Sequence, residues 1–271
     1  GVTNAVFDYV FIVPMKMGIA GAAYATALGY LVPAVFGLIY FWVKKEGLRF
    51  QTPRRDWKML LDSCLNGSSE MVTNLSGSIV TFLFNMLMMR YLGEDGVAAI
   101  TIVIYAQFLF VALFLGFSSG VAPVISFNYG SGNEAQLKRV FRICILFIGG
   151  SSVILFLLSL FAASGIVGLF SPAGTVPYEL GVHGFLLFST SYLFAGVNIF
   201  ASSMFTAFSD GKTSAFISFM RTLVFIVLGM LFLPRLLDVD GVWLAVPFAE
   251  LCTMVLSIVC LRCKRSVFRY A

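Results

Sequence analysis

Long apolar stretches separated by short polar breaks run through the whole chain. A helix of about 20 apolar residues crosses about 30 Å of hydrocarbon. The apolar runs are continuous rather than alternating, which favours helices over the strands of a membrane barrel. The predicted spans are residues 19–43, 64–90, 97–127, 141–169, 181–208, 214–234 and 242–261. We therefore expect an all-α fold, a polytopic transmembrane helix bundle.

A shorter apolar run at residues 2–14 precedes these spans. Because the chain begins with Gly1 rather than Met, we interpret this run as a span whose front is missing. It is not a signal peptide, since it lacks a basic start and carries Asp8 in its middle. The breaks between the later spans contain turn-forming residues, as at 93–96 and 238–241.

Composition supports a membrane protein. Hydrophobic residues make up 59% of the chain and charged residues 11%, whereas soluble domains carry about 25% charged residues. The mean hydropathy is +0.95. A soluble fold needs more polar surface than this chain supplies, but lipid can solvate its apolar exterior. One membrane domain is therefore expected.

Basic residues sort onto one side of the predicted bundle. When successive breaks alternate between the two sides, fifteen of the 18 Lys and Arg residues fall on one side. The other side receives Lys16, Arg90 and Arg235. Lys and Arg favour cytoplasmic loops, so the rich side and the carboxy terminus should be cytoplasmic. The charge is a topology signal, and we expect no nucleic-acid partner.

The beginning and the end of the chain share a pattern at an offset of 220 residues: Pro14 aligns with Pro234, Gly21 with Gly241, and Ala25 with Ala245. Many transporters are built from two related bundles. The span at 64–90 would then begin the second bundle, and the front of the first bundle would lie outside this chain.

Several motifs resemble those of the multidrug and toxic compound extrusion (MATE) family. They are Asn4-x-x-x-Asp8, Gly18-Ile19-Ala20-Gly21, Asn128-Tyr129-Gly130 and Gly241-Val242-Trp243-x-Ala245. The resemblance covers the whole chain and implies helices five to twelve of a MATE-like fold, with two six-helix lobes of which the first is truncated. Residues 1–43 would be the last two helices of the amino-terminal lobe, 44–59 a basic cytoplasmic inter-lobe loop, and 60–271 the six-helix carboxy-terminal lobe. It also implies efflux of organic cations or drugs, driven by H⁺ or Na⁺.

A first candidate cation-coupling group contains Asn4, Asp8 and Thr26. Asn4 and Asp8 are four residues apart and share a helix face, and Thr26 should lie at similar depth on the next helix. A carboxylate inside a membrane marks a functional site by default. With neutral oxygens nearby it suits Na⁺, and when shielded from water it can carry a proton. The family resemblance indicates the same three residues.

A second candidate group, for cation coupling or substrate binding, lies in the second lobe. Asn66, Glu70 and Asn74 recur every four residues and form one polar stripe. The resemblance adds a position on a later helix, where some family members have an Asp and this chain has Asn198. That difference favours Glu70 as a proton or substrate-charge group over a Na⁺ site.

Two further groups have structural interpretations. Arg221 and Glu250 approach similar depths from opposite sides of the membrane on successive spans, which predicts a structural ion pair. Gly116, Gly120 and Pro123 combine small residues with a helix breaker, and we expect a bend or close packing there.

The sequence contains no phosphate-binding loop or nucleophile elbow, so we expect neither an enzyme nor an ATP-driven pump. Cys260 and Cys263 form a lone C-x-x-C pair, which we interpret as free thiols rather than a metal site. We expect no cofactor beyond H⁺ or Na⁺ as coupling ion.

The expected partners are membrane lipid and small amphipathic or cationic substrates. We expect a multi-pass monomer in the plasma membrane, namely a bacterial inner membrane. The alternative functions are a lipid-linked oligosaccharide flippase of the same superfamily, a membrane-embedded enzyme, or a non-transport membrane subunit. A flippase would carry more basic residues in its cavity than the mostly acidic intramembrane charges found here.

Overall fold

The computed structural model describes residues 2–43 and 56–270, with the backbone only at residues 65, 66 and 68–70. Regular structure in the described residues is helical, which confirms the all-α prediction. The elements are α1 (Val2–Ile12), α2 (Gly18–Val43), α3 (Trp57–Gly130), α4 (Glu134–Gly168), α5 (Val176–Ser189), α6 (Tyr192–Ala207), α7 (Gly211–Phe219), the π-helical turn η1 (Met220–Val224), α8 (Phe225–Phe232), α9 (Pro234–Trp243) and α10 (Ala245–Phe268).

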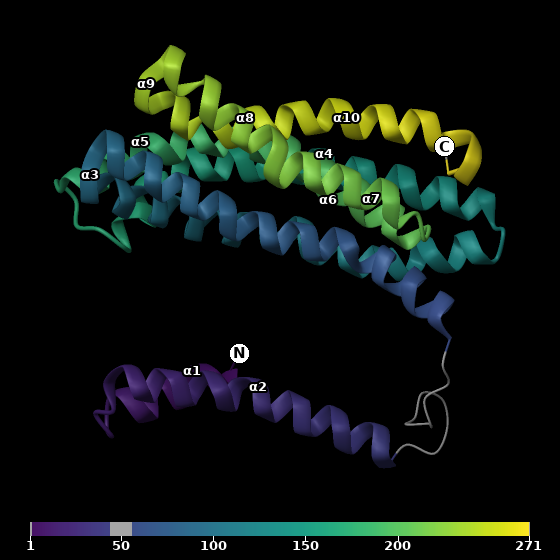
Figure 1. The fold of residues 1–271 in the computed structure, drawn as a ribbon, viewed down its shortest axis with the longest axis horizontal. Coiled ribbons are helices and arrows are strands. Elements are labelled where there is room, and N and C mark those ends of the chain that lie inside the picture. Colours follow the sequence, from purple (N-terminus) through teal and green to yellow (C-terminus); the bar gives the residue numbers. More distant parts are fainter. Residues whose placement is uncertain (1, 44–55, 271) are drawn as a thin grey trace. The chain divides into compact units, whose positions relative to one another are not determined.

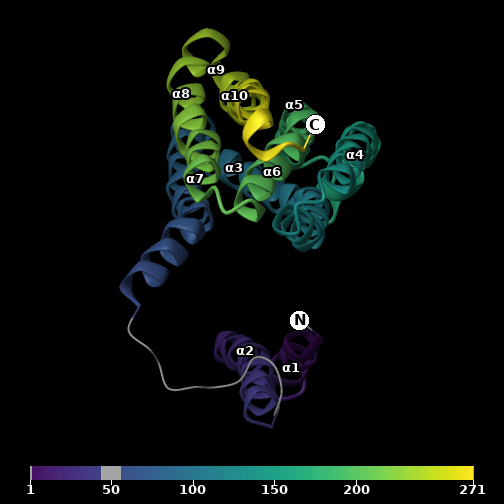
Figure 2. The same ribbon diagram turned by 90° about the vertical axis from the view of Figure 1, so that its right-hand side faces the viewer.

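The chain forms two compact units, Gly1–Trp57 and Lys58–Ala271. The first unit contains α1 and α2, and the second contains α3 to α10 (Figures 1 and 2). Most of the predicted basic loop at 44–59 lies outside the described residues, because the description stops at Val43 and resumes at Asp56.

In the first unit, α1 and α2 form a helical hairpin held by close backbone approach. A methyl group added at Gly21 would lie 2.9 Å from Cβ of Phe11, and one at Gly29 would lie 2.9 Å from Cβ of Asn4. Such small residues let two helices approach closely without a hydrophobic driving force between them. Only Gly21 and Ala25 are buried on α2. The pair therefore leaves most of its apolar surface for lipid or other helices.

Helix α3 is two antiparallel limbs joined at Gly93. Its 74 residues would span about 110 Å as one straight helix. Gly93 has φ 68° and ψ −151°, a conformation essentially confined to glycine. Gly96 then lies close enough to the Met88 carbonyl oxygen that an added methyl group would be 3.0 Å from it. The predicted break at 93–96 is therefore a tight reversal, and the predicted spans 64–90 and 97–127 are its limbs.

By length and composition, five helices among the described residues can cross a membrane: α2, residues 71–130 of α3, α4, residues 211–232, and α10. The pair α5 and α6, bent by 54° between them, makes a sixth. Counting the two limbs of α3 separately gives the seven predicted spans. Some helices are longer than the predicted spans: α4 begins at Glu134, whereas the predicted span begins at residue 141. The break predicted at 238–241 is present within α9 (Pro234–Trp243), because Asp238 has φ 48° and ψ −128° and interrupts the helix there.

The backbone breaks do not fall at the predicted helix-bending residues. Gly116, Gly120 and Pro123 lie in α3, where the only non-helical residue inside the helix is Gly93. A methyl group at either glycine would meet no atom within 4 Å in the described part of the chain, so these glycines do not mediate close packing here. A bend does occur elsewhere, at residues 190–191 between α5 and α6. There Thr190 donates its hydroxyl hydrogen to the Leu187 carbonyl, a bond that commonly bends helices.

One end of the second unit, which we term the basic end, holds the starts of α4 and α7 and the end of α10 (Figure 1). Lys264 lies 3.2 Å from the carboxylate of Asp210, which caps α7. Burial by itself raises the pKa of Asp210, but hydrogen bonds from Thr213 and Lys264 outweigh it and lower the pKa. Beyond α10, the Tyr270 hydroxyl donates to the Leu261 carbonyl, and burial raises the pKa of this tyrosine to about 12. These contacts fix the chain end against the bundle.

The repeated pattern at the two chain ends has the same packing role in each unit. Ala25 and Ala245 are both fully buried. A methyl group at Gly241 would lie 2.3 Å from the Leu233 backbone, as one at Gly21 would approach Phe11. In each case the small residue lets one helix start directly against the end of the preceding one.

We predict that Gly93→Ala destabilises the second unit by about 1–3 kcal/mol, because alanine is strained in this backbone conformation although space for its methyl group exists. The matched control is Gly77→Ala on the same helix, where the backbone is helical and the space is also open; it should be neutral or slightly stabilising. Thermal unfolding midpoints in detergent measure both. Equal midpoints for the two variants would contradict the role of Gly93.

Candidate functional site

Glu250 is the centre of a polar network inside the second unit. It lies on α10 and is 4% exposed. One carboxylate oxygen accepts a hydrogen bond of 2.8 Å from Nε of Arg221, and the other accepts one of 2.7 Å from Nδ2 of Asn198. Ser257, two turns along α10, donates to Oδ1 of Asn198 at 3.0 Å. The expected ion pair between Arg221 and Glu250 is therefore present.

The local backbone brings Arg221 to this carboxylate. Arg221 lies in η1, a single π-helical turn between α7 and α8. A π turn adds one residue to the turn, so it shifts the direction of the side chains that follow it, and such turns are frequent at functional sites. The Arg221 side chain is 16% exposed and that of Glu250 is 5% exposed. A charge this buried requires compensation, which each group gives the other.

Asn198 lies inside the Glu250 network. Its side chain is fully buried on α6, and its amide donates both to the Glu250 carboxylate and to the Glu250 carbonyl oxygen at 2.8 Å. The structure thus places Asn198 in the ion-pair network rather than on an accessible surface. Its assignment to cation coupling or substrate binding stays a prediction.

Beside this network, hydroxyl groups connect α6 to α7. The Ser202 hydroxyl lies 2.9 Å from the hydroxyls of both Ser214 and Ser218, and the Thr206 hydroxyl lies 2.7 Å from that of Ser214. Sequence analysis missed this cluster. Its signal is the spacing of four residues between Ser202 and Thr206 and between Ser214 and Ser218, which puts each pair on one helix face.

The first candidate group comes together only in part. Nδ2 of Asn4 lies 3.5 Å from Oγ1 of Thr26, at the limit of a hydrogen bond, and the Thr26 hydroxyl donates to the Ala22 carbonyl at 2.9 Å. Asp8 lies one turn along α1 and is half-buried. Within the described residues no Lys or Arg forms an ion pair with it. A carboxylate without a fixed cation can accept a proton or a sodium ion.

For the second candidate group the structure gives only part of the geometry. The side chains of Asn66 and Glu70 lie outside the described residues, although both belong to α3. Asn74 is described and is exposed on α3, where it makes an interaction of its own. The polar stripe stays a prediction.

Residues 71–231 match the protein family MatE. The matched residues make up more than half of the chain. The chain belongs to the MatE family. This confirms the resemblance drawn from the sequence motifs. The match begins within the first limb of α3 and ends in α8.

Curated relatives of this MatE chain carry the name multidrug export protein MepA. The protein from Staphylococcus saprophyticus is 22% identical over 89% of this chain and 52% of its own length. That from Staphylococcus haemolyticus is 25% identical over 77% of this chain and 46% of its own length. The MatE chain therefore spans about half the length of these relatives.

Solved structures with the same fold include a MATE structure in complex with MaL6, at a TM-score of 0.88 and 22% identity. The match covers 99% of this chain and 61% of the chain in that structure. A MOP superfamily transporter from Pyrococcus furiosus has a TM-score of 0.87 at 23% identity, with 61% of its length covered. These likenesses confirm the MATE-like, membrane-spanning helical fold.

We predict that Glu250→Gln destabilises this MatE protein by about 3–5 kcal/mol, because it leaves the buried Arg221 charge without a carboxylate. The matched control is Glu134→Gln, which removes the exposed pair with Arg269 and should barely change the unfolding midpoint. Unfolding in detergent micelles measures both. A double variant, Arg221→Met with Glu250→Met, should recover part of the loss, and its failure to do so would show that shape rather than charge matters here.

Proposed function

We propose that the complete protein containing this chain is a secondary active antiporter that exports amphipathic or cationic drugs in exchange for H⁺ or Na⁺. Membership of the MatE family and the likeness to relatives named multidrug export proteins support this proposal. The chain itself contains no nucleotide-binding motif, so an ion gradient is the energy source that fits.

The ion-coupling part of this proposal rests on Asp8, a half-buried carboxylate without a basic partner among the described residues. Glu250 and Asp8, which each lie in an apolar helix, differ in how far their charge is compensated. Glu250 is held by Arg221 and Asn198, whereas Asp8 has no basic partner among the described residues. Asn4 lies one turn before Asp8 on α1, and its amide lies 3.5 Å from the Thr26 hydroxyl, so neutral polar groups lie on the same face of α1. We assign the coupling ion to the Asp8 group, because there an incoming cation would not have to displace an arginine.

Orientation follows from the distribution of charge at the two ends of the second unit. The basic end carries Lys138, Arg139, Arg142, Lys212, Arg262, Lys264, Arg265 and Arg269. Arg90 and Arg235 lie near the breaks at the opposite end, at Gly93 and at Asp238. We propose that the basic end and the carboxy terminus face the cytoplasm of a bacterial inner membrane.

We predict that Asp8→Asn, introduced into the full-length protein, lowers ion-driven drug transport about tenfold or more. Removing an interaction with a charged group costs about 1.5–3 kcal/mol, which corresponds to that loss. Uptake of a fluorescent cationic drug into inverted vesicles, driven separately by an imposed H⁺ or Na⁺ gradient, measures the effect. The gradient that drives the parent protein identifies the coupling ion.

The matched control for this experiment is Asp95→Asn, which removes an exposed carboxylate in the reversal after Gly93. It should transport like the parent. If Asp8→Asn also matches the parent, the coupling site lies elsewhere, with Glu70 as the next residue to test by Glu70→Gln. If the parent gives an efflux-deficient host no more drug resistance than the empty vector despite good membrane expression, drug export itself is refuted.

A further inference from the structure

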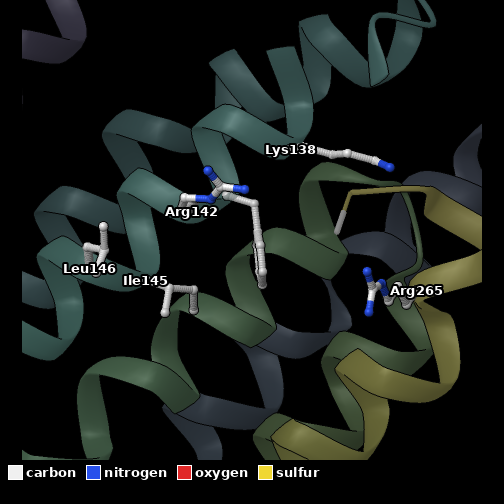
Figure 3. A pocket seen from close by; sticks show the side chains of 6 residues that line it. Lys138, Arg142, Ile145, Leu146 and Arg265 are labelled. Atoms are coloured by element: carbon white, nitrogen blue, oxygen red, sulfur yellow. The ribbon is translucent and has the colours of Figure 1, made fainter. Parts of the chain in front are cut away.

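A groove with a largely apolar wall and basic side chains around it lies between the first turns of α4 and the last turns of α10. It has a volume of about 330 Å³ and is lined by Lys138, Phe141, Arg142, Ile145, Leu146 and Arg265. Figure 3 shows Lys138 and Arg142 on the α4 side and Arg265 on the α10 side. We call this feature the α4–α10 groove.

Positive charge is in clear excess around this groove. A second hollow of about 340 Å³ shares Lys138 and Arg265 with it and adds Glu134, Arg262, Ser266 and Arg269. Among the described residues, Glu134 is the only acidic one lining either hollow, and it already forms an ion pair of 2.8 Å with Arg269. Arg265 makes an interaction of its own, and even without it Lys138, Arg142 and Arg262 leave a net positive charge that an anionic group would neutralise.

Charge changes to apolar surface along a single face of α4. Lys138, Arg142 and Ile145 follow one another at spacings of four and three residues, which places them on the same face. Leu146, one position further, is 69% exposed. The basic side chains belong to the second and third turns of α4, and Ile145 and Leu146 follow them in its apolar part. The groove thus offers cations at the level of lipid head groups and an apolar wall directly next to them.

A ligand for this surface needs an anionic head and an apolar body in that order. Arg and Lys side chains bind phosphate oxygens by charge-assisted hydrogen bonds. Basic pockets between transmembrane helices bind anionic lipid head groups on this principle. A nucleic acid or a phosphopeptide supplies the anion but no chain to cover Ile145 and Leu146.

We propose that the α4–α10 groove binds one anionic phospholipid, with its phosphodiester between Lys138, Arg142 and Arg265 and an acyl chain against Ile145 and Leu146. The bound lipid would connect α4 to α10, because cations from both helices contact the same phosphate. This inference rests on the membrane fold and is independent of the transported substrate and of the coupling ion.

The test is binding of phosphatidylglycerol to the purified full-length protein in detergent, measured by titration and native mass spectrometry. The groove variant is Lys138→Gln with Arg142→Gln. Each basic residue near a lipid surface contributes enough attraction that losing two should weaken binding about tenfold to thirtyfold. Arg142→Lys alone keeps the charge and should retain most of the affinity.

The matched control is Arg139→Gln with Lys212→Gln, which removes two charges at the same basic end but outside the groove. It should weaken binding less than threefold. Equal losses in the groove and control variants would overturn the proposal, because the lipid would then respond to overall charge. Matching elution volumes and circular dichroism spectra establish that both variants fold.

Two further ligands separate the lipid from its parts. Phosphatidylcholine has the chains without net charge, and glycerophosphoglycerol has the head group without chains. Both should bind at least tenfold more weakly than phosphatidylglycerol. If glycerophosphoglycerol binds as tightly as the lipid, the groove is a phosphate site and the lipid assignment is wrong; equal binding of phosphatidylcholine would refute the role of charge.

Discussion

In hydrocarbon no water replaces a lost hydrogen bond, so a buried charge depends on partners within the protein. The helices meet this requirement for the backbone, and the Glu250 network meets it for the buried Glu250 carboxylate. Both Glu250 carboxylate oxygens are occupied, one by Arg221 and one by Asn198, and Asn198 in turn accepts from Ser257. Because these residues come from α6, η1 and α10, satisfying one carboxylate fixes three elements of the second unit relative to each other.

The same constraint separates two carboxylates that look alike in sequence. Glu250 and Asp8 each interrupt an apolar helix, and both suggest function on that ground. In the structure Glu250 is neutralised by an arginine, which suits a structural role. Asp8 is half-buried one turn along α1 from Asn4, with no basic side chain paired to it in the part of the chain that the structure describes. The two carboxylates therefore differ in the partners that neighbouring helices supply rather than in the residue itself.

Much of the fold was predictable because the hydropathy and charge of each segment indicate its depth in the membrane. Hydropathy located the spans, and the Gly93–Gly96 break marked the reversal that the positive φ of Gly93 produces. Depth counting also paired Arg221 with Glu250. The predicted bending role of Gly116, Gly120 and Pro123 stays a prediction, since α3 is helical there and the 54° bend that the structure shows lies between α5 and α6. Glycine and proline permit a bend, but packing around the helix decides whether one forms.

The sequence by itself determined the helical class, the span boundaries to within a few residues, the charge asymmetry and the family motifs. These depend on position along the membrane normal, which hydropathy and charge report directly. Only the tertiary structure decided that Asn198 contacts Glu250, that Ser202 meets Ser214 and Ser218, and that α4 and α10 enclose a basic groove. Those contacts depend on which helices are neighbours and how each is rotated about its axis, and a pattern of apolar residues leaves both undetermined.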